Sequence, residues 1–328
     1  EDGTVFTGTS IGSTKSVISE IVFNTSMTGY LEVLTDPSYA GQAVVMTYPL
    51  IGNYGVTPDM ESAQPWPDGY IVRELSRIPS NFRCQGTIQE FLKEHDIPGI
   101  AGIDTRALTK ILREKGTMNG MITTDENYKL DEILPQLHVY NTGNVVDKVT
   151  CSEKKVLKAD GYKVALLDFG AKNNIAQSLH KRGCEVTIYP AHTTAEEILS
   201  SDPDGIMLSN GPGDPKACTD IIKEVKKLYD SEVPIFAICL GHQLMALATG
   251  ADTYKLKYGH RGGNHPVKDL ETGRVYISSQ NHGYAVDADS LDQTIAVPAF
   301  TNVNDGTNEG LKYTGKNIFT VQFHPEAC

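Results

Sequence analysis

The stretch that decides the fold is Pro234-Ile-Phe-Ala-Ile-Cys-Leu-Gly-His-Gln243, in which a short apolar strand turns abruptly into a helical run at 243–249. This pattern is typical of a nucleophile elbow, which holds one side chain out of the sheet at a sharp bend. Cys239 occupies the bend, where N–H groups at the start of a helix can stabilise a thiolate and an oxyanion. Because buried cysteines are more often packing residues, the elbow alone leaves both interpretations open.

A second strand-like run supplies the partners that a nucleophilic cysteine needs. Residues 318–323 lead directly into His324-Pro325-Glu326. An imidazole can accept the thiol proton, and a carboxylate two residues later can bind the other ring nitrogen and fix its tautomer. The sequence therefore predicts a catalytic triad of Cys239, His324 and Glu326.

A glycine-rich loop follows a third strand-like segment. Residues 205–209 lead into Asn210-Gly-Pro-Gly-Asp-Pro215, and loops at this edge of an open α/β sheet commonly hold ligands. Glycine permits close backbone approach, so the N–H of Gly211 is a candidate oxyanion donor. Taken alone, the loop equally suits an ordinary tight turn, and only the coincidence of three strand edges favours a site.

The composition is that of an ordinary globular protein long enough for two domains. The chain has 328 residues, 40% of them hydrophobic and 21% charged, with a formal net charge of −12. Without a basic cluster or an apolar run of roughly 20 residues, we expect no nucleic-acid partner and no membrane association. The absence of a secretory signal predicts a cytoplasmic protein. Six scattered cysteines without a CxxC pair favour free thiols.

The two parts of the sequence have different patterns. Residues 1–140 predict a smaller α+β domain, with strands at 17–24 and 42–48 and helices at 88–95 and 104–115. Residues 141–161 are polar and charged, and we interpret them as a linker. Residues 162–328 predict an α/β domain with a parallel sheet, because strand-like and helical runs alternate. Its strand-like runs are 163–168, 184–189, 205–209 and 234–239, with added strands at 253–258, 275–279, 295–300 and 318–323.

The three motifs together resemble those of the class I, triad-type glutamine amidotransferases. Neighbouring segments are similar to the carbamoyl-phosphate synthase small chain: FNTSMTGY (23–30), TDPSYA (35–40), DFGAK (168–172), GHRGGNHP (259–266) and QNHG (280–283). The likeness runs over essentially the whole chain. It implies a flavodoxin-like amidotransferase domain, with a mostly parallel sheet and helices on both faces, after the small-chain domain.

This resemblance implies a glutaminase subunit. The chain would bind L-glutamine, hydrolyse it to glutamate through a γ-glutamyl thioester on Cys239, and deliver ammonia to a large synthetase subunit. That partner would use ATP and Mg²⁺ to make carbamoyl phosphate for arginine and pyrimidine synthesis. We therefore expect no cofactor and no metal in this chain.

The resemblance also implies a set of substrate contacts. The N–H groups of Leu240 and Gly211 would form the oxyanion hole. The residues implied to hold glutamine are Ser38, Gly211, Gly213, Leu240, Gln243, Asn281, Gly283 and Tyr284. Because Ser38 belongs to the N-terminal domain, the site would lie at a domain junction.

Several alternatives stay open from the sequence. His242 is a rival base, although a residue at a helix start points in a different direction from Cys239. His260 and His265 suggest a metal, but their spacing matches no zinc signature and favours a structural use. One alternative is another triad amidotransferase. A second is an impaired or non-catalytic small-chain fragment, because the family continues beyond Glu326 into a terminal helix.

Overall fold

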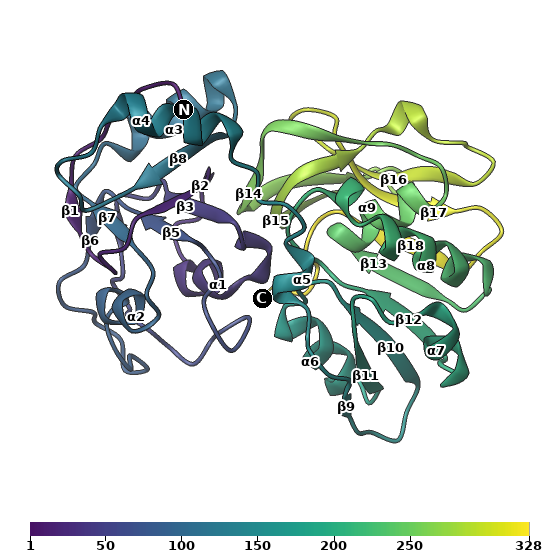
Figure 1. Cartoon of the computed structure of the whole chain (residues 1–328). Helices are drawn as coiled ribbons and strands as arrows, with labels where there is room; N and C mark the ends of the chain where they lie inside the picture. The colour runs from purple at the N-terminus through teal and green to yellow at the C-terminus, as the bar shows by residue number, and fades with distance from the viewer. Residues whose placement is uncertain (328) are drawn as a thin grey trace. The chain divides into compact units, whose positions relative to one another are not determined.

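The computed structural model describes residues 1–327, which form two compact units, residues 1–143 and 144–327 (Figure 1). The predicted linker, 141–161, contains α5 (Val146–Val149) and β9 (Lys155–Leu157). Strand β9 pairs with β11 (Glu185–Pro190) in the large sheet of the second unit. Most of the predicted linker therefore belongs to the second unit, because its backbone hydrogen bonds are made there.

The first unit is built on a six-stranded sheet in the order β1-β7-β5-β3-β2-β8, with β4 and β6 paired separately. The predicted α+β character is confirmed, and Asp104 caps its helix by accepting from the N–H of Ala107 at 3.0 Å. Two further helices, α1 and α4, were not predicted. The elements are β1 (Thr9–Ser10), β2 (Val17–Asn24), α1 (Tyr30–Thr35), β3 (Gln42–Met46), β4 (Leu50–Ile51), β5 (Gly69–Ile71), β6 (Glu74–Leu75), α2 (Ile88–Glu94), β7 (Gly99–Ala101), α3 (Thr105–Lys115), β8 (Met118–Ile122) and α4 (Leu130–Val139).

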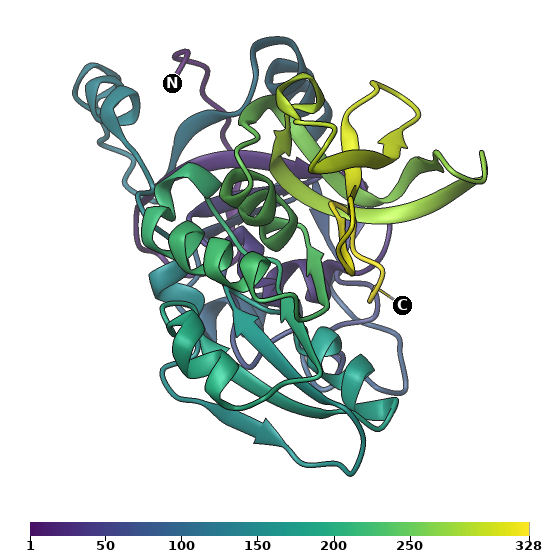
Figure 2. The same cartoon turned by 90° about the vertical axis from the view of Figure 1, so that its right-hand side faces the viewer.

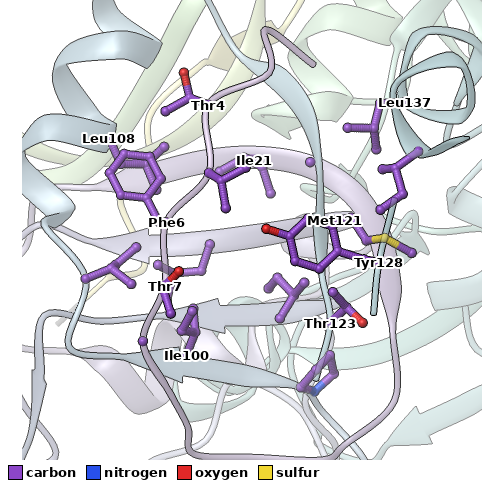
Figure 3. A pocket seen from close by; sticks show the side chains of 18 of the residues that line it. Thr4, Phe6, Thr7, Ile21, Ile100, Leu108, Met121, Thr123, Tyr128 and Leu137 are labelled. Carbon is purple, nitrogen blue, oxygen red and sulfur yellow. The ribbon is translucent and has the colours of Figure 1, made fainter. Parts of the chain in front are cut away.

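The first unit also contains a pocket of about 430 Å³ (Figure 3). Its walls come from the N-terminal segment, β8, α3 and α4, and include the apolar side chains of Phe6, Leu108 and Met121. Within the described chain, none of the residues predicted to bind glutamine lines this pocket. This pocket is therefore not the predicted glutamine site.

The second unit is built on a ten-stranded sheet in the order β15-β14-β16-β17-β18-β13-β12-β10-β11-β9. Strands β18, β13, β12, β10 and β11 are parallel and form its centre, while β9 and β14–β17 pair antiparallel. Figure 2 shows the added C-terminal strands in light green to yellow. The remaining bounds are β10 (Lys163–Asp168), α6 (Asn173–Lys181), α7 (Ala195–Ser200), β12 (Gly205–Leu208), α8 (Thr219–Asp230), β13 (Ile235–Ile238), α9 (Leu240–Ala248), β14 (Thr253–Asp269), β15 (Val275–Val286), β16 (Ala296–Asn302), β17 (Asn308–Tyr313) and β18 (Ile318–Val321).

Helices cover both faces of the parallel strands, as predicted. On one face, Ile175 of α6 packs in a cluster with Leu166 and Met207. On the other face, Val225 of α8 packs in a cluster with Leu167, since neighbouring strand residues point to opposite faces. Across residues 1–327, no helix combines the length and apolar character needed to cross a membrane.

Candidate active site

The elbow forms where the sequence predicts it, between β13 and α9. Cys239 has φ 52° and ψ −106°, a conformation that residues other than glycine rarely adopt and that surrounding structure must enforce. Its N–H donates to the carbonyl of Val321 at 2.8 Å. Helix α9 begins immediately at Leu240, earlier than the predicted 243. A Cβ on Gly241 would lie 2.5 Å from the carbonyl oxygen of Leu208, so only glycine allows this close approach.

The predicted base and its carboxylate reach the same edge of the sheet. Strand β18 lies parallel to β13, with Val321 opposite Ile238, so His324 follows β18 where Cys239 follows β13. The N–H of His324 donates to the carbonyl of Ser279 at 2.9 Å. Nδ1 of His324 lies 2.7 Å from Oε1 of Glu326, and both side chains are buried. The carboxylate therefore fixes the orientation of the ring, with Nδ1 protonated and Nε2 pointing away from Glu326.

The charges around this pair favour an imidazolium beside a carboxylate. Burial and the charge of Lys172 oppose protonation of the ring, but Glu326 and the Cys239 side chain outweigh them and raise the pKa of His324 to about 10. Burial also opposes ionisation of Glu326, but His324 and Lys172 lower the pKa of Glu326 to about 2. The ring is thus well suited to accept and hold a proton.

The thiol lies close to two acceptors. Sγ of Cys239 donates to the carbonyl of Asn281 at 3.6 Å, and the Cys239 side chain also interacts with the ring of His324. Among the described residues, Nε2 of His324 is buried and has no partner at hydrogen-bond distance. A rotation of the thiol would redirect its proton from the Asn281 carbonyl to Nε2.

The glycine-rich loop lies against the start of α9. A Cβ on Gly211 would fall 2.2 Å from the carbonyl oxygen of Phe169 and 2.8 Å from Cδ2 of Leu240, so the loop backbone approaches both residues closely. The N–H of Gly241 already donates to the carbonyl of Ser209 at 3.0 Å. The N–H groups of Leu240 and Gly211 are therefore the better candidates for an oxyanion hole, as the resemblance implies.

The predicted substrate residues of the second unit gather around β15. Nε2 of Gln243 donates to the carbonyl of Tyr284 at 2.8 Å and to Oε1 of Gln322 at 2.9 Å, which leaves its own Oε1 as an acceptor. Strand β15 carries Asn281 and Gly283 next to this contact. Among these residues, Asn281 contacts the thiol directly, because its carbonyl accepts from Sγ of Cys239 at 3.6 Å.

Two predicted substrate residues lie elsewhere. Gly213 has φ +89°, and a Cβ there would meet Cγ2 of Val145 at 3.1 Å, so the loop needs glycine at this position. Ser38 lies in the first unit, on the short helix Pro37–Tyr39, where its N–H donates to Oδ1 of Asp36 at 2.9 Å. Its contact with substrate stays a prediction.

The rival base, His242, has a different environment. Its ring is fully buried, and Nδ1 lies 2.7 Å from Oγ1 of Thr320 on β18. Burial lowers the pKa of His242 to about 3, so the ring stays neutral near pH 7. This geometry disfavours His242 as the proton acceptor for Cys239.

Two polar residues of the site were not predicted. Lys172 places Nζ 3.8 Å from Oε1 of Glu326, and the side-chain amide of Asn174 donates to the backbone carbonyl of Glu326. Both lie where β10 leads into α6. A signal for these two residues was available, because strand β10 lies beside β12. The carboxyl end of β10 therefore faces the same edge of the sheet as Gly211.

Comparison with known proteins yields matches over both units. Residues 1–122 match the family described as carbamoyl-phosphate synthase small chain, CPSase domain, and residues 165–328 match class I glutamine amidotransferase. A carbamoyl phosphate synthase small chain from Listeria monocytogenes is 52% identical over 100% of this chain and 90% of its own length. Proteins of the same name from Clostridium perfringens and Fusobacterium nucleatum are each 51% identical over the whole chain, covering 93% and 92% of their own lengths.

Proposed function

The chain belongs to the family of carbamoyl-phosphate synthase small chains, and on this premise we propose that its second unit hydrolyses the side-chain amide of glutamine. The observation that carries the proposal is the strained Cys239 beside the buried pair of His324 and Glu326. That combination is the arrangement of an activated thiol nucleophile with an oriented base.

The first half of the reaction forms a thioester and releases ammonia. His324 holds on Nε2 the proton that comes from Cys239, and Sγ attacks the carboxamide carbon of glutamine as a thiolate. The resulting oxyanion accepts hydrogen bonds from the N–H groups of Leu240 and Gly211. When the tetrahedral intermediate collapses, the C–N bond breaks and His324 returns the proton to the leaving nitrogen, which departs as ammonia.

The second half hydrolyses the thioester. His324 removes a proton from water, whose oxygen attacks the thioester carbon. The C–S bond then breaks, His324 returns that proton to Sγ, and glutamate and the Cys239 thiol result. Glu326 keeps Nδ1 protonated throughout and stabilises each imidazolium that forms. The chain's own residues thus complete the cycle without a cofactor.

Substrate binding and the partner are further parts of this proposal. The free Oε1 of Gln243 and the backbone around Asn281, Gly283 and Tyr284 would hold the amino and carboxylate ends of glutamine, with Gly213 and Ser38 completing the set. A large synthetase subunit would receive the ammonia and supply ATP and Mg²⁺ chemistry. The cytoplasmic location and the arginine and pyrimidine pathways stay predictions.

The direct test is glutamate release from glutamine by the wild-type chain, Cys239→Ala and a control, Cys184→Ala. Cys184 is another free cysteine of the second unit. We expect Cys239→Ala to lose roughly a thousandfold or more in rate, with the control active. Adding a large synthetase subunit with ATP and bicarbonate should raise the wild-type rate. If wild type leaves glutamine intact in both conditions, the chain is a non-catalytic small chain; cleavage by Cys239→Ala would require another nucleophile.

A further inference from the structure

The second unit holds a buried cluster of two histidines and a glutamate that the proposed reaction does not use. His260 lies on β14, His282 on β15 and Glu309 on β17, with exposed fractions of 7%, 5% and 0%. One potential ligand atom from each lies within 4.8 Å of the other two. We propose that these three side chains bind a divalent transition-metal ion, with Zn²⁺ as the best match.

The strands bring the three residues together although they are far apart in sequence. His260 and His282 are direct cross-strand partners in the β14–β15 hairpin. Their ring centroids are 4.9 Å apart and the rings are nearly perpendicular, at 88°. Nδ1 of His260 lies 3.4 Å from Oε1 of Glu309. A short movement of the side chains would bring these donor atoms to the spacing of a metal coordination shell.

Each histidine is oriented as metal-binding histidines usually are. Nε2 of His260 lies 2.7 Å from Oδ2 of Asp305, so Nδ1 is the nitrogen left to face Glu309. Nδ1 of His282 lies 2.7 Å from the carbonyl oxygen of Tyr284. A carbonyl can only accept, so Nδ1 of His282 carries the hydrogen and Nε2 presents a lone pair. Ligating imidazoles characteristically donate their other N–H to a carboxylate or carbonyl in this way.

A mismatch between acceptors gives the strongest indication of a cation. Oε1 of Gln280 lies 3.0 Å from Nε2 of His282, and Nε2 of Gln280 donates to Oε2 of Glu309 at 3.0 Å. The lone pair of a neutral His282 therefore faces a carbonyl oxygen. Rotating the Gln280 side-chain amide by 180° does not remove the mismatch between acceptors, because the amide oxygen would then face the Glu309 carboxylate. One additional positive group resolves it, either a metal ion or an extra proton.

The donor set selects the class of ion. Two imidazole nitrogens and one carboxylate oxygen suit Zn²⁺ and its first-row neighbours, whereas Mg²⁺ and Ca²⁺ prefer oxygen ligands alone. A further nitrogen is near, since the ring of His265 lies 5.3 Å from that of His260. Within the described chain, Nε2 of His265 is buried without a hydrogen-bond partner. From the sequence we expected no metal, because the spacing of His260 and His265 matches no zinc signature.

An ion bound here would affect the segment of β15 that is proposed to bind glutamine. His282 lies between Asn281 and Gly283, and its Nδ1 shares the Tyr284 carbonyl with Gln243. Holding His282 would therefore fix the strand segment proposed to bind glutamine. This consequence rests on the proposed function, whereas the binding of metal does not.

The test is titration of the metal-free wild-type chain with Zn²⁺ by calorimetry and with Co²⁺ by absorption spectroscopy. We expect one equivalent to bind, with the visible bands of Co²⁺ bound to nitrogen and oxygen ligands, and the Co²⁺ bands should persist in Cys239→Ala. Glu309→Gln should lower the affinity for Zn²⁺ by more than about 100-fold, because loss of an outer partner alone costs about 10–100-fold. Gln retains the shape and an oxygen to accept from Asn302, which bonds Glu309 at 3.2 Å.

The control is Glu271→Gln, whose side chain is 80% exposed and which should bind metal like wild type. Thermal unfolding without metal checks that Glu309→Gln folds. If wild type takes up no stoichiometric ion, or if His260→Ala and Glu309→Gln both bind as wild type does, the proposal is wrong and the cluster holds an extra proton. Glutaminase activity is measured separately, so failure of the metal site and failure of the glutaminase proposal are distinguishable.

Discussion

Two buried histidine–glutamate pairs lie in the second unit, and their surroundings differ. Nδ1 of His324 lies 2.7 Å from Oε1 of Glu326, and Nδ1 of His260 lies 3.4 Å from Oε1 of Glu309. Lys172 adds a positive charge 3.8 Å from Glu326. At the other pair an additional negative charge is present, since a carboxylate oxygen of Asp305 lies 2.7 Å from Nε2 of His260.

The third charge decides what each pair can do. Beside the thiol, the charge of Lys172 opposes protonation of His324, although Glu326 and the Cys239 side chain still raise the pKa of the ring to about 10. At His260, a second carboxylate instead attracts positive charge into the cluster. The same two residue types therefore support proton transfer in one place and cation binding in the other.

The largest expected effect comes from replacing, one at a time, the two histidines near the nucleophile. His324→Asn should reduce kcat for glutamine hydrolysis by roughly a thousandfold or more, because the base is lost. His242→Asn should change kcat by less than about tenfold, although it should lower stability because a buried polar contact with Thr320 is altered. Steady-state kinetics and denaturant unfolding of both variants separate the two roles. An inactive but stable His242→Asn would make His242 the base.

Removing the carboxylate of the triad should have an intermediate effect. Glu326→Gln should lower kcat by less than His324→Asn does, and it should lower the pKa of His324, since the charge that favours the imidazolium is gone. In wild type, the folded-state pKa of His324 lies above its ordinary 6.5, so its contribution to stability is complete below 6.5 and lost as pH rises through about 10. The pKa of Glu326 lies below its ordinary 4.5, so its contribution is lost as pH falls through about 2.

Unfolding free energies measured across these two pH windows check the assignment. In Glu326→Gln, the loss of stability above pH 6.5 should be smaller and should end at a lower pH, because the folded-state pKa of His324 falls toward its ordinary 6.5. The acid-side loss due to residue 326 should disappear, because glutamine does not titrate. Identical stability curves for wild type and variant would contradict the buried ion pair.

Strand ends made the active site predictable from sequence, whereas side-chain packing did not. Cys239 and His324 were found because parallel strands expose their carboxyl ends at one edge. The grouping of His260 with His282 and Glu309 was not predicted, because antiparallel register, not sequence spacing, brings these residues together. The short helix α1 starts after Gly29 in a left-handed conformation, and α4 contains Pro135, so both lack ordinary helix signals.

The smallest effect should come from the lysine that distinguishes the two pairs. Lys172 is buried and its charge opposes protonation of His324, so Lys172→Met should raise the pKa of His324 above about 10. A ring that holds its proton more tightly returns it to the leaving nitrogen more slowly, and kcat should fall by less than about tenfold. An NMR titration of His324 and steady-state kinetics measure both effects, with Lys223→Met, whose side chain is 70% exposed, as the matched control. A lower pKa or a faster enzyme in Lys172→Met would show that the third charge does not set the behaviour of the pair.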